Sequence, residues 1–192
     1  MKNHQLFLYL VVVGGRIAKA NIEVHDVRWV IGSKIEDTFD ELRKGWFGSI
    51  DGLHIDSYKK IYSVDGYKIK IKKSQIKKST SKFIKGVNNN KKLWFINLGG
   101  YDPKSMQEKH EFGLLVASTA SDAKKMAKSK WLDGFYKKHN DDIDCLQRFS
   151  DVDDCRLIKH INDWEIELIP ENIKYEQTNY PDWFGYLRID NK

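Results

Sequence analysis

Four short motifs in this chain place a histidine two residues from a carboxylate. They are Glu23-x-His25, His54-x-Asp56, Glu108-x-His110 and His139-x-Asp141. Residues i and i+2 of a β-strand point to the same face of the sheet, so each motif would aim an imidazole and a carboxylate in one direction. Such a set can bind Zn²⁺, Mn²⁺ or Fe²⁺ through nitrogen and oxygen ligands, or orient a general base.

The same eight residues also have a structural interpretation, which the sequence favours. Each histidine–carboxylate pair could tie a loop to a strand through hydrogen bonds, as buried polar groups require. A duplication copies such structural devices together with functional ones. These residues are therefore candidate ligand-binding residues and a candidate metal site, and none is assigned a catalytic role. No cofactor is expected, with a divalent metal as the alternative.

The motifs recur because the chain contains two copies of one sequence unit. Gly14-Gly15 returns as Gly99-Gly100, and Trp46 returns as Trp131. The separation is constant, since 99 − 14, 110 − 25, 131 − 46 and 139 − 54 all equal 85. A constant separation over this length indicates an internal duplication.

Each copy has the hydrophobic pattern of a ββαββ unit. Continuous apolar runs predict first strands that are buried on both faces. The second strands begin with Glu-x-His and become apolar further on. Asp65-Gly66 is a strong hairpin signal before the closing strand of the first copy. The expected strands cover residues 5–13, 22–32, 54–62 and 67–71, and then 92–98, 107–117, 143–149 and 164–169.

A helix is expected between the second and third strands of each copy. In the first copy Ile35, Phe39, Leu42 and Trp46 form one helical stripe. Alanines and Trp131 repeat that stripe in the second copy, and each tryptophan is predicted to anchor the core. The predicted N-caps are Ser33 with Glu36, and Ser118 with Ser121 or Asp122.

The predicted fold class is therefore α+β. It consists of a duplicated ββαββ unit, with two pseudo-twofold-related halves that have largely antiparallel sheets and one helix each. The predicted division of the chain is a first repeat at 1–72, a lysine-rich linker at 73–91, a second repeat at 92–170 and an aromatic C-terminal tail at 171–192.

The positive charge of the chain is concentrated around the linker. The net charge is +6, but residues 68–92 contain ten lysines and no acidic residue, which leaves 6 − 10 = −4 for the rest. Such a segment is more often a solvated connector than a nucleic-acid surface. Nucleic acid is therefore an alternative partner that the sequence does not favour.

The tail after Pro170 carries Tyr175, Tyr180, Trp183, Phe184 and Tyr186. So many aromatic residues are not expected to remain in water. We expect the tail to pack on the body and cover an edge strand, with a docking surface for a protein partner as the alternative. A homodimer is a second alternative, because duplicated units often descend from one.

The apolar run from Leu6 to Val13 imitates a signal peptide. Its counterpart Leu93–Leu98 lies inside the chain, so we expect both runs to be buried strands. No apolar stretch approaches the roughly 20 residues of a membrane span. The two cysteines, Cys145 and Cys155, form no disulfide framework. A cytoplasmic location with reduced thiols is therefore expected.

Several of these motifs together resemble the bacterial domain of unknown function fifteen-forty-three, which occurs as one or two copies per chain. The matching text is Gly14-Gly15, Asn21-Ile-Glu23, His25-Asp-Val27, Trp46, His54-Ile-Asp56, Val64-Asp-Gly-Tyr67, Ile96-Asn-Leu-Gly-Gly-Tyr101 and Val152-Asp-Asp154. The resemblance covers about residues 5–72 and 93–169. It implies a small soluble bacterial α+β protein and carries no established activity, substrate or catalytic residue.

Three functions remain open at this point. The first is a non-enzymatic binding or interaction module built from the tandem repeat, which is favoured because the chain lacks a catalytic signature. The second is a metal- or ligand-dependent enzyme of a hydrolytic kind that uses the repeated histidines and carboxylates. The third is a nucleic-acid binder that acts through the lysine-rich linker. Whether the protein is an enzyme stays undecided at this level.

Overall fold

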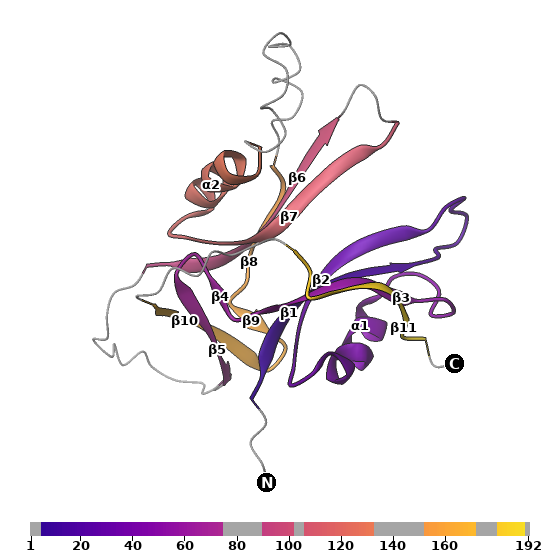
Figure 1. Cartoon of the computed structure of the whole chain (residues 1–192), viewed down its shortest axis with the longest axis horizontal. Coiled ribbons are helices and arrows are strands. Elements are labelled where there is room, and N and C mark those ends of the chain that lie inside the picture. Colours follow the sequence, from indigo (N-terminus) through magenta and orange to yellow (C-terminus); the bar gives the residue numbers. More distant parts are fainter. Residues whose placement is uncertain (1–4, 75–89, 102–105, 133–151, 172–179, 191–192) are drawn as a thin grey trace. The chain divides into compact units, whose positions relative to one another are not determined.

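The computed structural model describes residues 5–74, 90–101, 106–132, 152–171 and 180–190. These residues form mostly antiparallel sheets and two α-helices, which confirms the α+β class (Figure 1). The chain divides into two compact units. One contains residues 1–73 and 161–192, and the other contains residues 74–160.

The first unit is built on a sheet with the order β11-β3-β1-β2. Strand β1 (Phe7–Gly15) lies antiparallel to both β2 (Val24–Gly32) and β3 (His54–Ile61). The continuous apolar run therefore forms the predicted central strand, and Leu8 and Val11 are completely buried. Because alternate residues of a strand face opposite ways, β1 supplies apolar side chains to both faces of this sheet.

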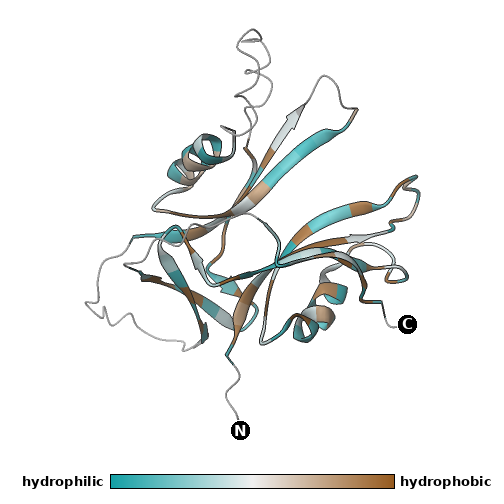
Figure 2. Cartoon of the chain, in the orientation of Figure 1, coloured by the Kyte–Doolittle hydropathy of each residue, from teal (hydrophilic) through white to brown (hydrophobic). Residues whose placement is uncertain are grey.

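One face of this sheet is covered by the helical segment, which consists of a 3₁₀ turn (Ile35–Thr38) and α1 (Phe39–Gly45). Leu42 packs there in one core with Tyr9 and Val11. The outer side of α1 is polar, so that apolar and hydrophilic residues are mixed along it (Figure 2).

The predicted cap formed by Ser33 with Glu36 is wrong by one residue at each position, because the N-cap is Lys34 and the carboxylate that accepts the backbone N–H groups belongs to Asp37. The 3₁₀ turn begins at Ile35, so its third residue is Asp37. The Asp37 carboxylate accepts hydrogen bonds from the backbone N–H groups of Ser33 and Lys34, both at 3.1 Å, and from the Ser33 hydroxyl. The Ser33 hydroxyl is the main cause of the lowered pKa of Asp37.

Trp46 is a core anchor, as predicted. Its ring is 7 % exposed and packs with the buried residues of α1 and β1. The indole Nε1 donates to the carbonyl oxygen of Ser49 at 3.0 Å, which ties the next loop to the core. A Cβ at Gly15 would lie 3.0 Å from this ring, so the second glycine of the Gly-Gly pair makes room for the tryptophan.

The second unit repeats this arrangement with a sheet of order β7-β6-β8. Its strands are β6 (Lys92–Tyr101), β7 (Glu108–Ala117) and β8 (Val152–Leu157), and α2 covers residues Ala120–Leu132. Ala123 and Ala127 of α2 are fully buried in the core with Trp94 and Ile96. The helix begins one residue later than predicted, because the Thr119 hydroxyl rather than Ser118 accepts the backbone N–H of Asp122 at 3.1 Å.

The third strand of the second copy is β8. Residues 143–149, where a strand was expected, lie outside the described residues. Strand β3 pairs with β1 through a register shift that skips Asp56, and β8 pairs with β6 through the same kind of shift, which skips Asp153. The separation of these two positions is 153 − 56 = 97. The second copy therefore contains 97 − 85 = 12 additional residues between its second and third strands.

After the third strand, each copy continues into a hairpin. One hairpin consists of β4 (Ser63–Val64) and β5 (Tyr67–Lys73), and the other of β9 (His160–Ile161) and β10 (Trp164–Pro170). Asp65 and Asn162 occupy the same turn position with φ of 50°, and 162 − 65 again equals 97. The Asp-Gly hairpin signal is thereby confirmed.

The two hairpins combine into one sheet of order β4-β5-β10-β9. Lys70 of β5 faces Glu167 of β10. These two residues occupy equivalent positions of the two hairpins, because 167 − 70 equals 97, the separation of the two copies from the third strand onward. The antiparallel ladder is therefore symmetric about this pair, with Ile69 opposite Leu168 and Ile71 opposite Ile166. This register is what a two-fold relation between the hairpins requires.

The compact units do not have the boundaries of the predicted sequence repeats. Residues from 161 onward, which belong to the predicted second repeat, 92–170, form one unit with residues 1–73. The physical reason is the ladder itself, which joins the closing strand of the second copy to that of the first. The linker at 73–91 lies mostly outside the described residues.

The Glu167→Gln substitution tests how much the ion pairs of Glu167 stabilise the pairing of β5 with β10. The Glu167 carboxylate lies 2.6 Å from Lys72 Nζ and 3.7 Å from Lys70 Nζ, and the hydrogen bond from Lys72 lowers its pKa. A carboxyl with a lowered pKa stabilises the folded state at neutral pH, and this contribution is lost as the pH falls through that pKa. We expect E167Q to reduce the free energy of unfolding by less than about 1 kcal/mol at neutral pH, because the pair is partly exposed.

Urea unfolding of E167Q and wild type at neutral and acid pH measures this effect. The difference between the two proteins should disappear at acid pH, where Glu167 is protonated in the folded and unfolded states alike. Glu165→Gln, on the same strand, is the matched control. A difference that persists unchanged in acid would show that Glu167 does not act through its charge.

The C-terminal tail covers an edge of the first sheet, as expected. Strand β11 (Trp183–Arg188) pairs antiparallel with β3, and Trp183 stacks on Tyr58 with ring centroids 5.8 Å apart. The tail is thus part of the first unit, not a separate segment. Phe184 and Tyr186 remain exposed.

Two smaller expectations concern the membrane and the cysteines. Among the described residues, neither helix is long and apolar enough to cross a membrane. Cys155 is a free thiol whose pKa is raised by burial. Cys145 lies outside the described residues.

Candidate metal centre

Four side chains of the first copy converge at one end of the β1–β2–β3 sheet. They are Glu23, His25, His54 and Asp56, here named the His–carboxylate cluster. One nitrogen or oxygen atom from each lies within 4.8 Å of the others. His54 Nε2 lies 3.0 Å from Glu23 Oε1 and 3.2 Å from Asp56 Oδ1. His25 Nε2 lies 3.3 Å from Glu23 Oε1 and 3.2 Å from Asp56 Oδ2.

The strand register explains why the two imidazoles meet. Gly14 of the central strand faces His25 on β2 and His54 on β3 at the same level. The imidazoles lean together over the glycine, because a Cβ at Gly14 would lie 2.6 Å from His54 Nε2 and 2.9 Å from His25 Cδ2. Real Cβ atoms do not approach other atoms so closely. Gly14 is thus required by the cluster.

A β-bulge places the fourth member. The ladders of β3 with β1 and with β11 both skip Asp56, so two neighbouring strands leave this residue unpaired. Bulges bend a strand and redirect a side chain, and they are common beside functional sites. The Asp56 carboxylate thereby reaches within 3.0 Å of the position that a Gly14 Cβ would take.

A hydrogen bond from the His54 ring determines which of its nitrogens carries a proton. Its Nδ1 lies 2.8 Å from the carbonyl oxygen of Gly52, and a carbonyl only accepts, so Nδ1 carries a proton. In the neutral imidazole Nε2 then has a lone pair, which faces the oxygens of Glu23 and Asp56. Lone pairs and carboxylate oxygens repel one another unless a cation or a proton lies between them.

A second indication comes from Asp56 itself. Its Oδ2 atom is buried and receives no hydrogen bond from any described residue, although His25 Nε2 lies 3.2 Å away. Buried carboxylate oxygens are normally paired or coordinate a metal. A proton on His25 Nε2 or a bound cation would satisfy this oxygen.

The spacing of the four groups suits a first-row metal. Ligands 2.0–2.2 Å from a metal are about 3.3–3.6 Å apart in a tetrahedron and about 2.8–3.1 Å apart at adjacent octahedral positions. The N···O separations of 3.0–3.3 Å in the cluster span the gap between these two ranges, with 3.0 Å inside the octahedral range, 3.3 Å at the lower end of the tetrahedral range and the two values of 3.2 Å between them. Imidazole and carboxylate ligands suit Zn²⁺, Mn²⁺ and Fe²⁺.

The described residues of the second copy repeat the first part of this arrangement. His110 faces Gly99 just as His25 faces Gly14. Its Nε2 lies 3.8 Å from Glu108 Oε2, and its Nδ1 lies 3.3 Å from the Asn97 amide nitrogen. The first half of the motif is thus structurally repeated.

The predicted equivalence of His139-x-Asp141 with His54-x-Asp56 stays a prediction, because His139 and Asp141 lie outside the described residues. Among the described residues, the bulge position that Asp56 occupies in the first copy is occupied by Asp153 in the second. The 12 additional residues after the second strand shift the separation from 85 to 97 at this point.

Sequence patterns did not identify every residue of this centre. The steric role of Gly14 was missed, although its repetition as Gly99 was the available signal. Gly52, Tyr186 and Asp190, which surround His54, were also missed. Their contacts join distant parts of the chain, and no local motif marks them.

Comparisons with known proteins support the duplication. A family model described as Domain of Unknown Function (DUF1543) matches residues 20–71 and 105–157. Among solved structures, the crystal structure of a protein Il1583 from Idiomarina loihiensis is similar, with a TM-score of 0.69 and 29 % sequence identity. The similarity covers 96 % of this chain and 99 % of that chain. No curated protein matches this chain.

Proposed function

Because this chain belongs to the DUF1543 family and contains two copies of its domain, for which no activity is established, we propose a function from the geometry of the cluster. We propose that the His–carboxylate cluster of the first copy binds one divalent first-row metal ion. The observation that carries this proposal is the convergence of two imidazole nitrogens and two carboxylates at 3.0–3.3 Å around Gly14.

The side chains of the cluster differ in exposure, which supports an open metal site that solvent can reach rather than a closed structural site. His54 is 1 % exposed, whereas the side chain of His25 is 52 % exposed and that of Glu23 is 35 % exposed. Structural zinc sites are enclosed by four protein ligands, whereas catalytic sites keep a position for water or substrate. A metal held between a buried and an exposed histidine would be reachable from solvent.

A metal site that is open to solvent supports hydrolysis as the reaction class. A bound divalent metal lowers the pKa of a coordinated water and polarises a carbonyl or phosphoryl oxygen. Within this chain, the buried His54 and the partly exposed Asp56 would hold the metal, and Glu23, which is also partly exposed, could accept a proton. This role for Glu23 extends the metal proposal and depends on it.

Metal titration of the purified chain tests the proposal. We expect one equivalent of Zn²⁺ or Mn²⁺ to bind in isothermal titration calorimetry. His25→Ala should weaken this binding by at least about 100-fold, since loss of a direct ligand costs more than the roughly 10–100-fold that is typical of outer-shell partners. His110→Ala is the matched control, because His110 has the same register in the second copy and should leave the affinity unchanged. Equal effects of both substitutions would contradict assignment of the metal to the first copy.

The interaction module remains an alternative, and the exposed Phe184 and Tyr186 of β11 are what support it. The nucleic-acid alternative has less support among the described lysines. Lys70 and Lys72 of β5 are compensated by Glu167 on the neighbouring strand. Paired charges of this kind add little to the positive field that attracts phosphates.

A further inference from the structure

The two copies differ in one element beside the cluster. The sheet of the first copy has a fourth strand, β11, next to β3, whereas the described part of the second copy has three strands and ends at β8. Among the described residues, the copy that has β11 is also the copy in which a histidine of the third strand is buried. The added strand and this imidazole thus occur together in the first copy.

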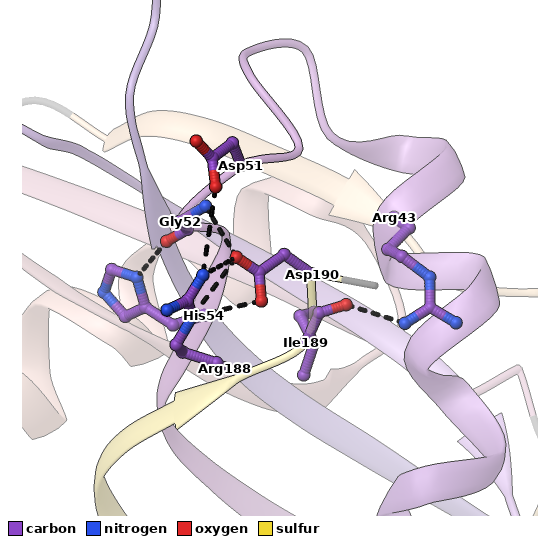
Figure 3. Close-up of polar contacts among 7 residues, drawn as sticks. All are labelled: Arg43, Asp51, Gly52, His54, Arg188, Ile189 and Asp190. Atoms are coloured by element: carbon purple, nitrogen blue, oxygen red, sulfur yellow. Dashed lines mark hydrogen bonds and ion pairs between the residues drawn. The ribbon is translucent and has the colours of Figure 1, made fainter. Parts of the chain in front are cut away.

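The residues after β11 contact the backbone that orients His54 (Figure 3). Asp190 Oδ2 accepts the backbone N–H of Gly52 at 2.8 Å, and the Gly52 carbonyl accepts the Nδ1–H of His54 at 2.8 Å. The Asp190 side chain is 2 % exposed and is paired with the Arg188 guanidinium. One residue, Gly52, therefore connects a buried carboxylate of the tail to the imidazole of the cluster, through its N–H on one side and its carbonyl on the other.

The same strand covers the ring of His54. Arg188 faces His54 in the ladder, and the Tyr186 ring lies with its centroid 4.1 Å from the imidazole centroid. Tyr186 reaches this position because the ladder skips residues 185 and 186 opposite Asp56. Gly185 permits the bulge with φ of +151°, a conformation that other residues rarely adopt.

We propose that Asp190 is a positioning residue for the metal centre: through Gly52 it holds His54 as the Nδ1–H tautomer, with Nε2 directed into the cluster. Metal-binding histidines usually donate their second ring nitrogen to a carbonyl or carboxylate, and loss of such support lowers metal affinity about 10–100-fold. The inference rests on the proposed function, and it assigns to the tail a role at the centre that is distinct from covering an edge strand.

Two aspartates of the tail provide a matched comparison. Asp182 and Asp190 each accept a backbone N–H of the first copy, from Lys60 at 2.7 Å and from Gly52 at 2.8 Å. Only Asp190 is connected to His54. We expect Asp190→Ala to lower Zn²⁺ affinity about 10–100-fold in calorimetry of the full chain, and Asp182→Ala to leave it unchanged. Equal losses in the two variants would overturn the proposal.

A second measurement separates positioning from stability. Two-dimensional ¹H–¹⁵N NMR of the metal-free protein at about pH 8, above the ordinary titration of histidine, reports which ring nitrogen of His54 is protonated. We expect Nδ1 in wild type and in D182A, and an increased Nε2–H population in D190A. An unchanged tautomer in D190A would overturn the proposal.

Should D190A fail to fold, Asp190→Asn replaces it, because an amide oxygen can still accept from Gly52 while the pairing with Arg188 is lost. We expect D190N to retain the Nδ1–H tautomer, and loss of that tautomer would contradict the role of the Gly52 hydrogen bond. The NMR experiment needs no metal. A wild type that binds no metal but shows this tautomer dependence would therefore refute the proposed function and leave the positioning role standing.

Discussion

Gly14→Ala is expected to abolish metal binding by the His–carboxylate cluster while the chain still folds. The new Cβ would lie 2.6 Å from His54 Nε2, 2.9 Å from His25 Cδ2 and 3.0 Å from Asp56 Oδ2. All three are side-chain atoms, so they move aside at a cost of about 1–3 kcal/mol, as in other overpacked sites. The donor atoms then no longer converge. The measurement is the rise in melting temperature on addition of Zn²⁺, which wild type should show and G14A should lack.

Gly15→Ala is the matched control for this substitution. Gly15 is the next residue of the same strand, and its Cβ would point to the other face, 3.0 Å from the Trp46 ring. We expect G15A to be destabilised by overpacking and yet to keep the metal-dependent rise in melting temperature. A G14A protein that binds metal as tightly as wild type would show that the cluster is not the site.

Asp56→Asn is expected to affect stability and metal affinity in opposite directions. Metal affinity should be lost, because an amide is a poor replacement for a carboxylate ligand. In the metal-free protein an asparagine NH₂ can donate to an imidazole nitrogen, whereas Asp56 Oδ2 has no donor among the described residues. We expect the metal-free variant to gain about 0.5–1.5 kcal/mol in the free energy of unfolding.

Denaturant unfolding with chelator, combined with metal titration, measures both effects of D56N. A loss of metal affinity together with a gain in the stability of the metal-free protein is typical of a residue that serves function at some cost in stability. Destabilisation of the metal-free variant would instead mean that a charged imidazole pairs with Asp56. The cluster would then be a structural ion pair, as the sequence interpretation favoured.

The elements that the sequence predicted well are those whose pattern is local. The apolar run of β1, the helical stripe that ends at Trp46 and the Asp65-Gly66 turn each lie within a few consecutive residues, and all three are confirmed. The pairing of Glu23 with His25 also follows from the strand period alone. Duplication strengthened these predictions, because two copies showed the same pattern.

The features that the sequence did not predict depend on contacts between distant residues. A bulge such as that at Asp56 has no sequence signature of its own, and 12 additional residues displaced the corresponding position in the second copy. The pairing of β5 with β10 depends on which strand edges of the two hairpins remain unpaired. The local sequence pattern does not specify this. The hydrogen bond from Gly52 to Asp190 joins residues 138 positions apart.

Anomalous X-ray diffraction at the zinc edge, from crystals of the full chain grown with Zn²⁺, would locate a metal bound by the His–carboxylate cluster. We expect one strong anomalous peak about 2.0–2.2 Å from the donor atoms of His25, His54 and Asp56, over Gly14. Zinc found only on the protein surface, with these imidazole nitrogens still 3.2 Å from the Asp56 oxygens, would contradict this expectation.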